Sequence, residues 1–141
     1  MEPTTRYRLP RSAVLRGRDV FGRLFREGDG LRRGQLVVKY AFTSGESSEV
    51  HTGFVVRRNA GSAVKRNRLR RLLREAYRMQ RHRFSESVPV GRQLRLVILW
   101  SGSGEQALRP SLDSIQSDMR MALGAISSRI RKRADEVAGE P

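Results

Sequence analysis

Hydrophobic residues in part of this chain alternate with other residues, which is the spacing of strands. Large apolar residues recur at every second position in Leu36–Phe42 and again in Val50–Val56, which predicts two strands that each bury one face. The polar segment Ser44–Ser48 between them has the composition of a turn, so we expect the two strands to pair as an antiparallel hairpin. Within Leu94–Trp100 the residues Leu96–Leu99 are all apolar, which predicts a strand covered on both faces.

Three other segments repeat apolar residues at spacings of three and four, as amphipathic helices do. The first begins near Arg18 and should end near Glu27, because Gly28 follows. The second spans about Ser62 to Arg83, and the third begins near Pro110. Their main apolar positions are Phe21, Leu24 and Phe25 in the first, Leu69, Leu72, Leu73, Ala76 and Tyr77 in the second, and Leu112, Ile115, Met119, Leu123, Ile126 and Ile130 in the third.

The order of these elements predicts an α+β fold in which helices pack on a small sheet. With 141 residues, the chain is long enough to bury one core and too short for a second domain. We expect a loose leader at residues 1–8, a single α+β domain at 9–130 and a frayed tail at 131–141.

Positive charge is concentrated in one part of the chain. The net charge is +15, and Arg57–Arg83 alone contains 11 Lys or Arg residues and one acid, Glu75. Such a surface favours a polyanion as partner, and nucleic acid over anionic lipid. At about 100° per residue, the side of the second helix opposite its apolar stripe carries Asn67, Arg71, Arg74, Arg78 and Arg81, and its flanks carry Arg66, Arg68 and Arg70.

This row of arginines is unfavourable for an isolated helix. Arg66 and Arg70 form a like-charge pair at four-residue spacing, as do Arg70 with Arg74 and Arg74 with Arg78. Each such pair destabilises a helix by about 0.2–0.5 kcal/mol. Bound phosphates would remove the repulsion and release counterions. The pattern therefore indicates a phosphate-binding face, whereas an ordinary solvated helix face would gain nothing from it.

Other kinds of chemistry find little support in the sequence. The chain has no cysteine, its two histidines, His51 and His82, lie far apart, and its acids form no paired motif, so neither a metal site nor a catalytic set is indicated. No apolar run reaches the ~20 residues needed to cross a bilayer. We therefore expect a soluble, cytoplasmic protein without catalytic or metal-binding side chains.

Aromatic residues admit two interpretations. Phe21 and Phe25 lie one turn apart and share a face of the first helix, where they could anchor it to the sheet or stack on single-stranded bases. Trp100, at the end of the apolar strand, is expected to serve packing.

The segment Gly61–Ala76 closely resembles the signature of the bacterial ribonuclease P protein subunit. Arg66-Asn67-Arg68 matches the RNR motif of that family, and basic, Leu-Leu-Arg and aromatic positions follow at the family's spacing. Similarity extends over about Arg8 to Ile130 and includes the first helix, the strand before the motif and the later strand Leu96–Trp100.

The resemblance implies a mixed sheet of about four strands in α-β-β-β-α-β-α order, with a short first strand near Gly30–Arg33 and a left-handed crossover through the basic helix. It implies that the subunit joins ribonuclease P RNA and that the holoenzyme, an endonuclease, removes the 5′ leader of precursor tRNA. Mg²⁺ would be held mainly by RNA, with none bound tightly by the protein. Neither a membrane nor a small-molecule substrate is implied.

The site residues implied by the resemblance fall into two groups. Arg66, Asn67, Arg68, Arg71 and Arg74 would face the catalytic RNA, and we add Arg70 and Arg78 from the same helix. Phe21, Phe25, Arg57 and Arg58 would border a cleft for the single-stranded leader. Arg57-Arg58-Asn59 replaces the Ser-Lys-Lys common in the family. Lys39 replaces a frequent aromatic, and Tyr40 should point to the other face.

Three rival functions remain open at the level of sequence. A ribosomal or RNA-chaperone protein could use the same basic surface as a structural binder. An autonomous nuclease would need hidden acidic metal ligands, such as Asp19, Glu27, Asp29 or Asp113. A helix that reads duplex DNA is disfavoured, because this helix offers arginines suited to backbone contacts and few base-reading partners.

Overall fold

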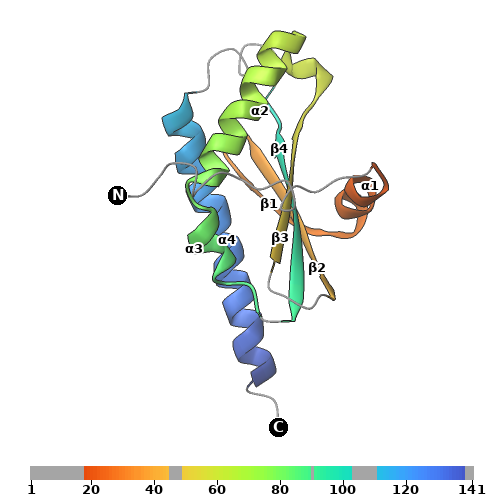
Figure 1. Cartoon of the computed structure of the whole chain (residues 1–141), viewed down its shortest axis with the longest axis vertical. Coiled ribbons are helices and arrows are strands. Elements are labelled where there is room, and N and C mark those ends of the chain that lie inside the picture. Colours follow the sequence, from red (N-terminus) through yellow and green to blue (C-terminus); the bar gives the residue numbers. More distant parts are fainter. Residues whose placement is uncertain (1–17, 45–48, 90, 103–110, 139–141) are drawn as a thin grey trace.

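The computed structural model describes residues 18–44, 49–89, 91–102 and 111–138 (Figure 1). The predicted leader at residues 1–8 lies outside them. The elements, in chain order, are α1 (Arg18–Glu27), β1 (Asp29–Arg33), β2 (Leu36–Ser44), β3 (Glu49–Val56), the 3-10 turn η3 (Arg58–Ala60), α2 (Ala63–Arg78), α3 (Arg81–Ser85), β4 (Arg92–Trp100) and α4 (Leu112–Ala138). The α+β class and the short first strand are therefore confirmed.

The sheet has the strand order β1-β2-β4-β3. β2 pairs antiparallel with β1 and with β4, whereas β3 pairs with β4 in parallel. The predicted hairpin between β2 and β3 is wrong, because β4 lies between them. The physical reason is the composition of β4: a strand that is apolar toward both faces gains most from the central position, so β2 and β3 each pair with β4.

The main core lies between one face of the sheet and the helices α2 and α4. Leu69, Leu73, Ala76 and Tyr77 of α2 are fully buried there, which confirms the predicted stripe except for Leu72, which is half-buried. Alternate residues of the strands meet them, among them Leu36, Val38 and Tyr40 of β2, Thr52 and Val56 of β3, and Leu96, Ile98 and Trp100 of β4. The predicted packing role of Trp100 is thus confirmed, as is the prediction that Tyr40 points to the face opposite that of Lys39.

Helix α1 covers the opposite face of the sheet (Figure 1). Leu24 of α1 and Val97 of β4 form a second, small core there. Because Val97 faces α1 while its neighbours Leu96 and Ile98 face α2 and α4, β4 is covered on both sides, as its sequence predicts.

Helix α2 begins where the sequence predicts and ends earlier. The Ser62 side chain accepts a hydrogen bond from the backbone N–H of Lys65 at 3.3 Å, which caps the first turn. The helix ends at Arg78, and the remainder of the predicted segment forms the separate helix α3. At the break, Gln80 donates a side-chain hydrogen bond to the carbonyl of Gln116 in α4 at 3.2 Å. Beyond this contact, α3 lies beside α4 (Figure 1).

The connection between β3 and β4 and the C-terminal helix complete the described fold. The parallel pair β3–β4 is connected through α2, and the left-handed sense of this crossover stays a prediction. Helix α4 continues to Ala138, well into the segment 131–141 that was expected to fray. In the parts of the chain with described structure, no helix is both long and apolar enough to span a membrane.

Tyr77 is a buried titratable group beneath α2. Its ring packs edge-on against Phe54, with ring centroids 5.7 Å apart. Its hydroxyl lies near that of Thr52, but the two do not form a hydrogen bond of good geometry. Burial raises the pKa of Tyr77 to about 12, although the Thr52 hydroxyl and the charge of Arg81 act in the opposite direction.

The raised pKa of Tyr77 predicts a loss of stability in alkaline solution. The unfolded phenol has a pKa near 10.0, so between that pH and about 12 the unfolded chain loses a proton that the native protein keeps. The free energy of unfolding should fall by up to about 2.7 kcal/mol over this interval. Urea denaturation across the same pH range measures it. Tyr77→Phe should lack this part of the decline, and equal alkaline losses in both proteins would contradict the assignment.

Candidate nucleic-acid interface

The outward side of α2 carries the residues that the sequence assigns to RNA. Asn67, Arg68, Arg71 and Arg74 are exposed, and Arg66, Arg70 and Arg78 are half-buried at its flanks or in side-chain contacts. All seven belong to one helix whose apolar stripe is fixed in the core. The structure therefore brings this predicted group together on one surface.

The side chains in the first turns of α2 differ in their hydrogen bonding. Arg70 donates a hydrogen bond to the Asn67 side-chain oxygen at 2.8 Å, which orients both groups. The Nε atom of Arg66 is buried and has no hydrogen-bond partner among the described residues. A buried donor of this kind is costly when unpaired, and a phosphate oxygen is a suitable acceptor for a guanidinium group. Arg66 is therefore a candidate for a direct contact with RNA.

Arg74 is held by an aromatic ring. Its guanidinium carbon lies 5.7 Å from the centroid of Phe54, which in turn contacts Tyr77. This is cation–π geometry, worth about 0.5–1 kcal/mol at an exposed site. The ring limits the freedom of the Arg74 side chain, so that less entropy is lost when the side chain binds a phosphate.

The charge of Arg78 is compensated within the helix. Its Nε and Nη2 atoms donate to the two carboxylate oxygens of Glu75 at 3.0 and 2.6 Å. These hydrogen bonds, together with the attraction between the charges, hold the pKa of Glu75 below and that of Arg78 above its usual value. Arg78 should therefore contribute less to the attraction of a polyanion than Arg71 or Arg74.

The second predicted group lies around the other face of the sheet. Phe21 and Phe25 are half-buried and pack with Leu24 against Ala41, Val55 and Val97, so both rings do anchor α1 to the sheet. Arg57 and Arg58 are exposed directly after β3, two and three residues beyond Val55. The two aromatic residues thus come from α1, and the two basic residues follow β3, where Arg58 begins η3.

Two cations on this face were not assigned from the sequence. Lys39 pairs with Val97, and Arg95 pairs with Ala41, in the register of β2 with β4, so both lie on the side covered in part by α1. A Cβ atom on Gly30 would lie 2.8 Å from the Cδ atom of Lys39, which places the lysine stem across β1. For Lys39, a single cation among the apolar residues of β2 was the available sequence signal.

Groups suited to catalysis do not gather in the described parts of the chain. His51 and His82 lie on β3 and α3, and no cluster of three or more His, Asp or Glu side chains could hold a metal ion within those parts. The described residues therefore do not fit a protein-held magnesium site. The arrangement can bind, orient and neutralise phosphates.

Comparison with known proteins supports the family resemblance along most of the chain. A family model described as Ribonuclease P matches residues 9–127. The ribonuclease P protein component of Chlorobaculum tepidum is 29% identical over 133 residues, which cover 86% of this chain and 85% of the relative. That of Desulfovibrio desulfuricans is 34% identical over 103 residues, which cover 73% of this chain and 75% of the relative.

Solved structures show the same fold. The RNase P protein of Staphylococcus aureus superimposes with a TM-score of 0.57 at 18% identity, over 81% of this chain and 94% of that protein. The RNase P protein of Thermotoga maritima does so with a TM-score of 0.56 at 23% identity, over 78% of this chain and 94% of that protein. At these identities the likeness concerns the fold, including its α-β-β-β-α-β-α order.

Replacing Arg74 by alanine should weaken binding to structured RNA. Loss of one phosphate contact should lower the slope of log affinity against log salt by about one unit. Stability should fall by no more than about 1 kcal/mol, because the lost cation–π contact is exposed. RNA titrations at several salt concentrations and urea denaturation measure the two effects. Arg71→Ala is the matched control without a ring contact among the described residues. A large loss of stability with an unchanged slope would show that Arg74 is structural.

Replacing Glu75 by glutamine should strengthen RNA binding. The change removes the acid from this helix face and releases Arg78, so the salt slope should rise by up to about 0.9 units and the affinity several-fold. Stability should change by less than about 1 kcal/mol, since the pair is at the surface. The same RNA titrations test this, with Glu86→Gln on the exposed end of α3 as a charge-matched control. Equal effects of the two substitutions would mean that only net charge matters.

Proposed function

Because the chain belongs to the ribonuclease P protein family, we propose that it binds the catalytic RNA of that ribonucleoprotein through α2 and the 5′ leader of precursor tRNA on the side of α1. The holoenzyme would cleave the leader from the tRNA. The protein would supply binding and charge neutralisation, and the RNA would supply the cleavage chemistry.

The single observation that carries the RNA-binding role is that α2 presents arginines without ion pairs to described residues on a firmly anchored helix. Arg66, Arg71 and Arg74 form no ion pair with any described residue, while the helix beneath them is anchored by fully buried side chains. A rigid helix with uncompensated guanidinium groups favours a structured RNA backbone, because little order remains to be created on binding.

Support for the leader site comes from the residues beside α1. A single strand needs a cationic track for its backbone and aromatic faces for its bases. Lys39, Arg95 and Arg57 supply cations, and Phe21 and Phe25 are partly exposed although they anchor the helix. Since β4 and its neighbours separate this face from α2, the leader and the catalytic RNA could be bound at the same time.

The proposed division of labour leaves metal chemistry with the RNA. Mg²⁺ would be held mainly by RNA phosphates, which offer the hard oxygen ligands that this ion prefers. The arginines of α2 would reduce repulsion between phosphates as the RNAs approach one another. The protein should therefore matter most when magnesium is scarce.

Reconstitution tests this function. Adding the protein to a bacterial ribonuclease P RNA at low magnesium should raise cleavage of precursor tRNA above that of RNA alone. Trimming the leader to one nucleotide should remove part of the gain, because contacts beside α1 are lost. Arg57→Gln should weaken the response to the long leader only, and Arg23→Gln, exposed on α1, serves as the control. No gain over RNA alone would refute the function, and a gain independent of leader length would refute the leader site.

A further inference from the structure

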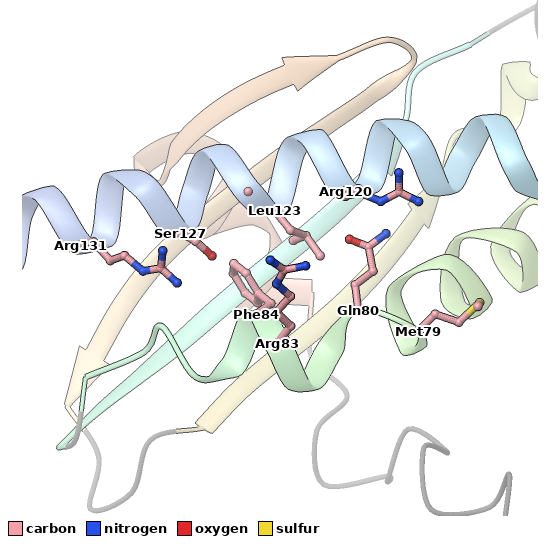
Figure 2. Close-up of a pocket in the computed structure, with 9 residues that line it drawn as sticks. Met79, Gln80, Arg83, Phe84, Arg120, Leu123, Ser127 and Arg131 are labelled. Atoms are coloured by element: carbon pink, nitrogen blue, oxygen red, sulfur yellow. The ribbon is translucent and has the colours of Figure 1, made fainter.

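A hollow of about 410 Å³ lies between α3 and α4, at the point where α2 ends. Phe84 of α3 and Leu123 of α4 form its apolar part, and both side chains are otherwise buried. Figure 2 shows Arg83 extending from α3 toward α4, at a position between Arg120 and Arg131 along that helix. The sheet separates this hollow from α1, so it is distinct from the proposed leader site.

Three unneutralised arginines surround the hollow. None of the residues that line it is acidic, and Arg83, Arg120 and Arg131 form no ion pair with any other described residue. Arg120 and Arg131 are 11 positions apart on α4, which corresponds to about 16 Å along the helix axis. This spacing exceeds the reach of one phosphate group and suits phosphates that flank a short run of nucleotides in one strand.

Gly124 leaves the backbone of α4 open at this hollow. Glycine is a poorer helix former than alanine, and this one lies well inside the helix, at residue 124 of Leu112–Ala138. A Cβ atom there would meet nothing within 4 Å. Packing within the described protein therefore does not require glycine. Close approach of a ligand to the helix backbone is a physical reason for glycine at such a position.

We propose that this hollow is a second contact site for the catalytic RNA, which places one unstacked nucleotide in it. The base would contact the small exposed edges of Phe84 and Leu123 at the floor of the hollow, and the flanking phosphates would be bound by Arg83, Arg120 and Arg131. Guanidinium groups bind phosphates in bidentate fashion, and unstacked bases are recognised by insertion between side chains. The volume falls within the range of small-ligand pockets, about 300–1,000 Å³.

Continuity with α2 identifies the partner, and this step rests on the proposed function. Met79 and Gln80, which follow directly on α2, form one edge of the hollow. An RNA bound along the arginines of α2 can therefore continue onto α3 and α4 without crossing the sheet. Precursor tRNA, which is proposed to reach the protein beside α1, would meet the opposite face.

Two substitutions at Gly124 test whether the hollow is occupied. Gly124→Gln obstructs the hollow without adding charge and should weaken binding to the catalytic RNA about tenfold. Gly124→Ala adds one carbon, favours the helix and should bind like the original protein. Thermal unfolding verifies that both variants fold. Equal affinity of the Gln and Ala variants would overturn the proposal.

A charge-matched comparison tests the arginines. Arg83→Gln combined with Arg131→Gln should lower the salt slope by about 1.5–2 units. Arg23→Gln combined with Arg26→Gln removes the same charge from exposed positions on α1 and should lower it by less than half as much. Equal effects of the two pairs would show a general charge effect and overturn the proposal.

Chemical probing of the RNA completes the experiment. The original protein should protect one nucleotide, or a short run, from 2′-hydroxyl acylation, and Gly124→Gln should leave it reactive while protection by α2 persists. An unchanged protection pattern would overturn the proposal. If the original protein failed to bind ribonuclease P RNA at all, the proposed function itself would be wrong, so the two failures are distinguishable.

Discussion

The attachment of α2 to the sheet is the interaction on which the rest of this protein depends. Leu69, Leu73 and Tyr77 are fully buried beneath a helix whose outer side repels itself. Burying one such side chain contributes about 1.5–3 kcal/mol, whereas each like-charge pair of the helix costs about 0.2–0.5 kcal/mol. Hydrophobic burial therefore outweighs the repulsion several times over. The fold can present uncompensated arginines to a partner because their own helix does not rely on them for stability.

The central position of β4 has a second consequence for function. Val97 supports α1 and Ile98 supports the core beneath α2 and α4, so one strand holds the two layers of helices apart. The surfaces on the two faces are rigidly related through the sheet although no residue belongs to both. For the proposed binding of a catalytic RNA and a substrate strand, such a fixed separation would be an advantage, since the geometry is set before either RNA binds.

The arginines of α2, α3 and α4 differ from one another in their local contacts. Arg78 is neutralised by Glu75, and Arg74 is fixed over Phe54. Arg66 has a buried donor without a partner in the described parts of the chain. Beyond the end of α2, Arg83 and Arg120 continue the positive surface around an apolar hollow. The side chains thus differ in how ready they are to bind phosphate, which a count of charges does not reveal. Local contacts with rings and acids determine which arginines have most to gain from RNA.

Local spacing by itself determined most elements of this protein and the arginine-rich face of α2. The period of α2 separates Leu69 and Leu73 from Arg71 and Arg74, and the apolar run of β4 predicts a doubly covered strand. These features were predictable because a helix or strand presents its side chains at a fixed angular repeat. The short strand β1 followed only from the resemblance to a family, since five residues with one buried position show no clear period.

Only the tertiary structure decided which strands pair and which distant cations meet. The alternation in β2 and β3 suits a hairpin, but it is equally satisfied when both pair with β4, and burial of β4 selects the second arrangement. Arg83 and Arg120 lie 37 positions apart and come together because α2 ends at Arg78 and α3 runs along α4. Sequence patterns report which face of an element is apolar. They do not report which other element covers it, because that choice is made by the total surface buried when all elements pack at once.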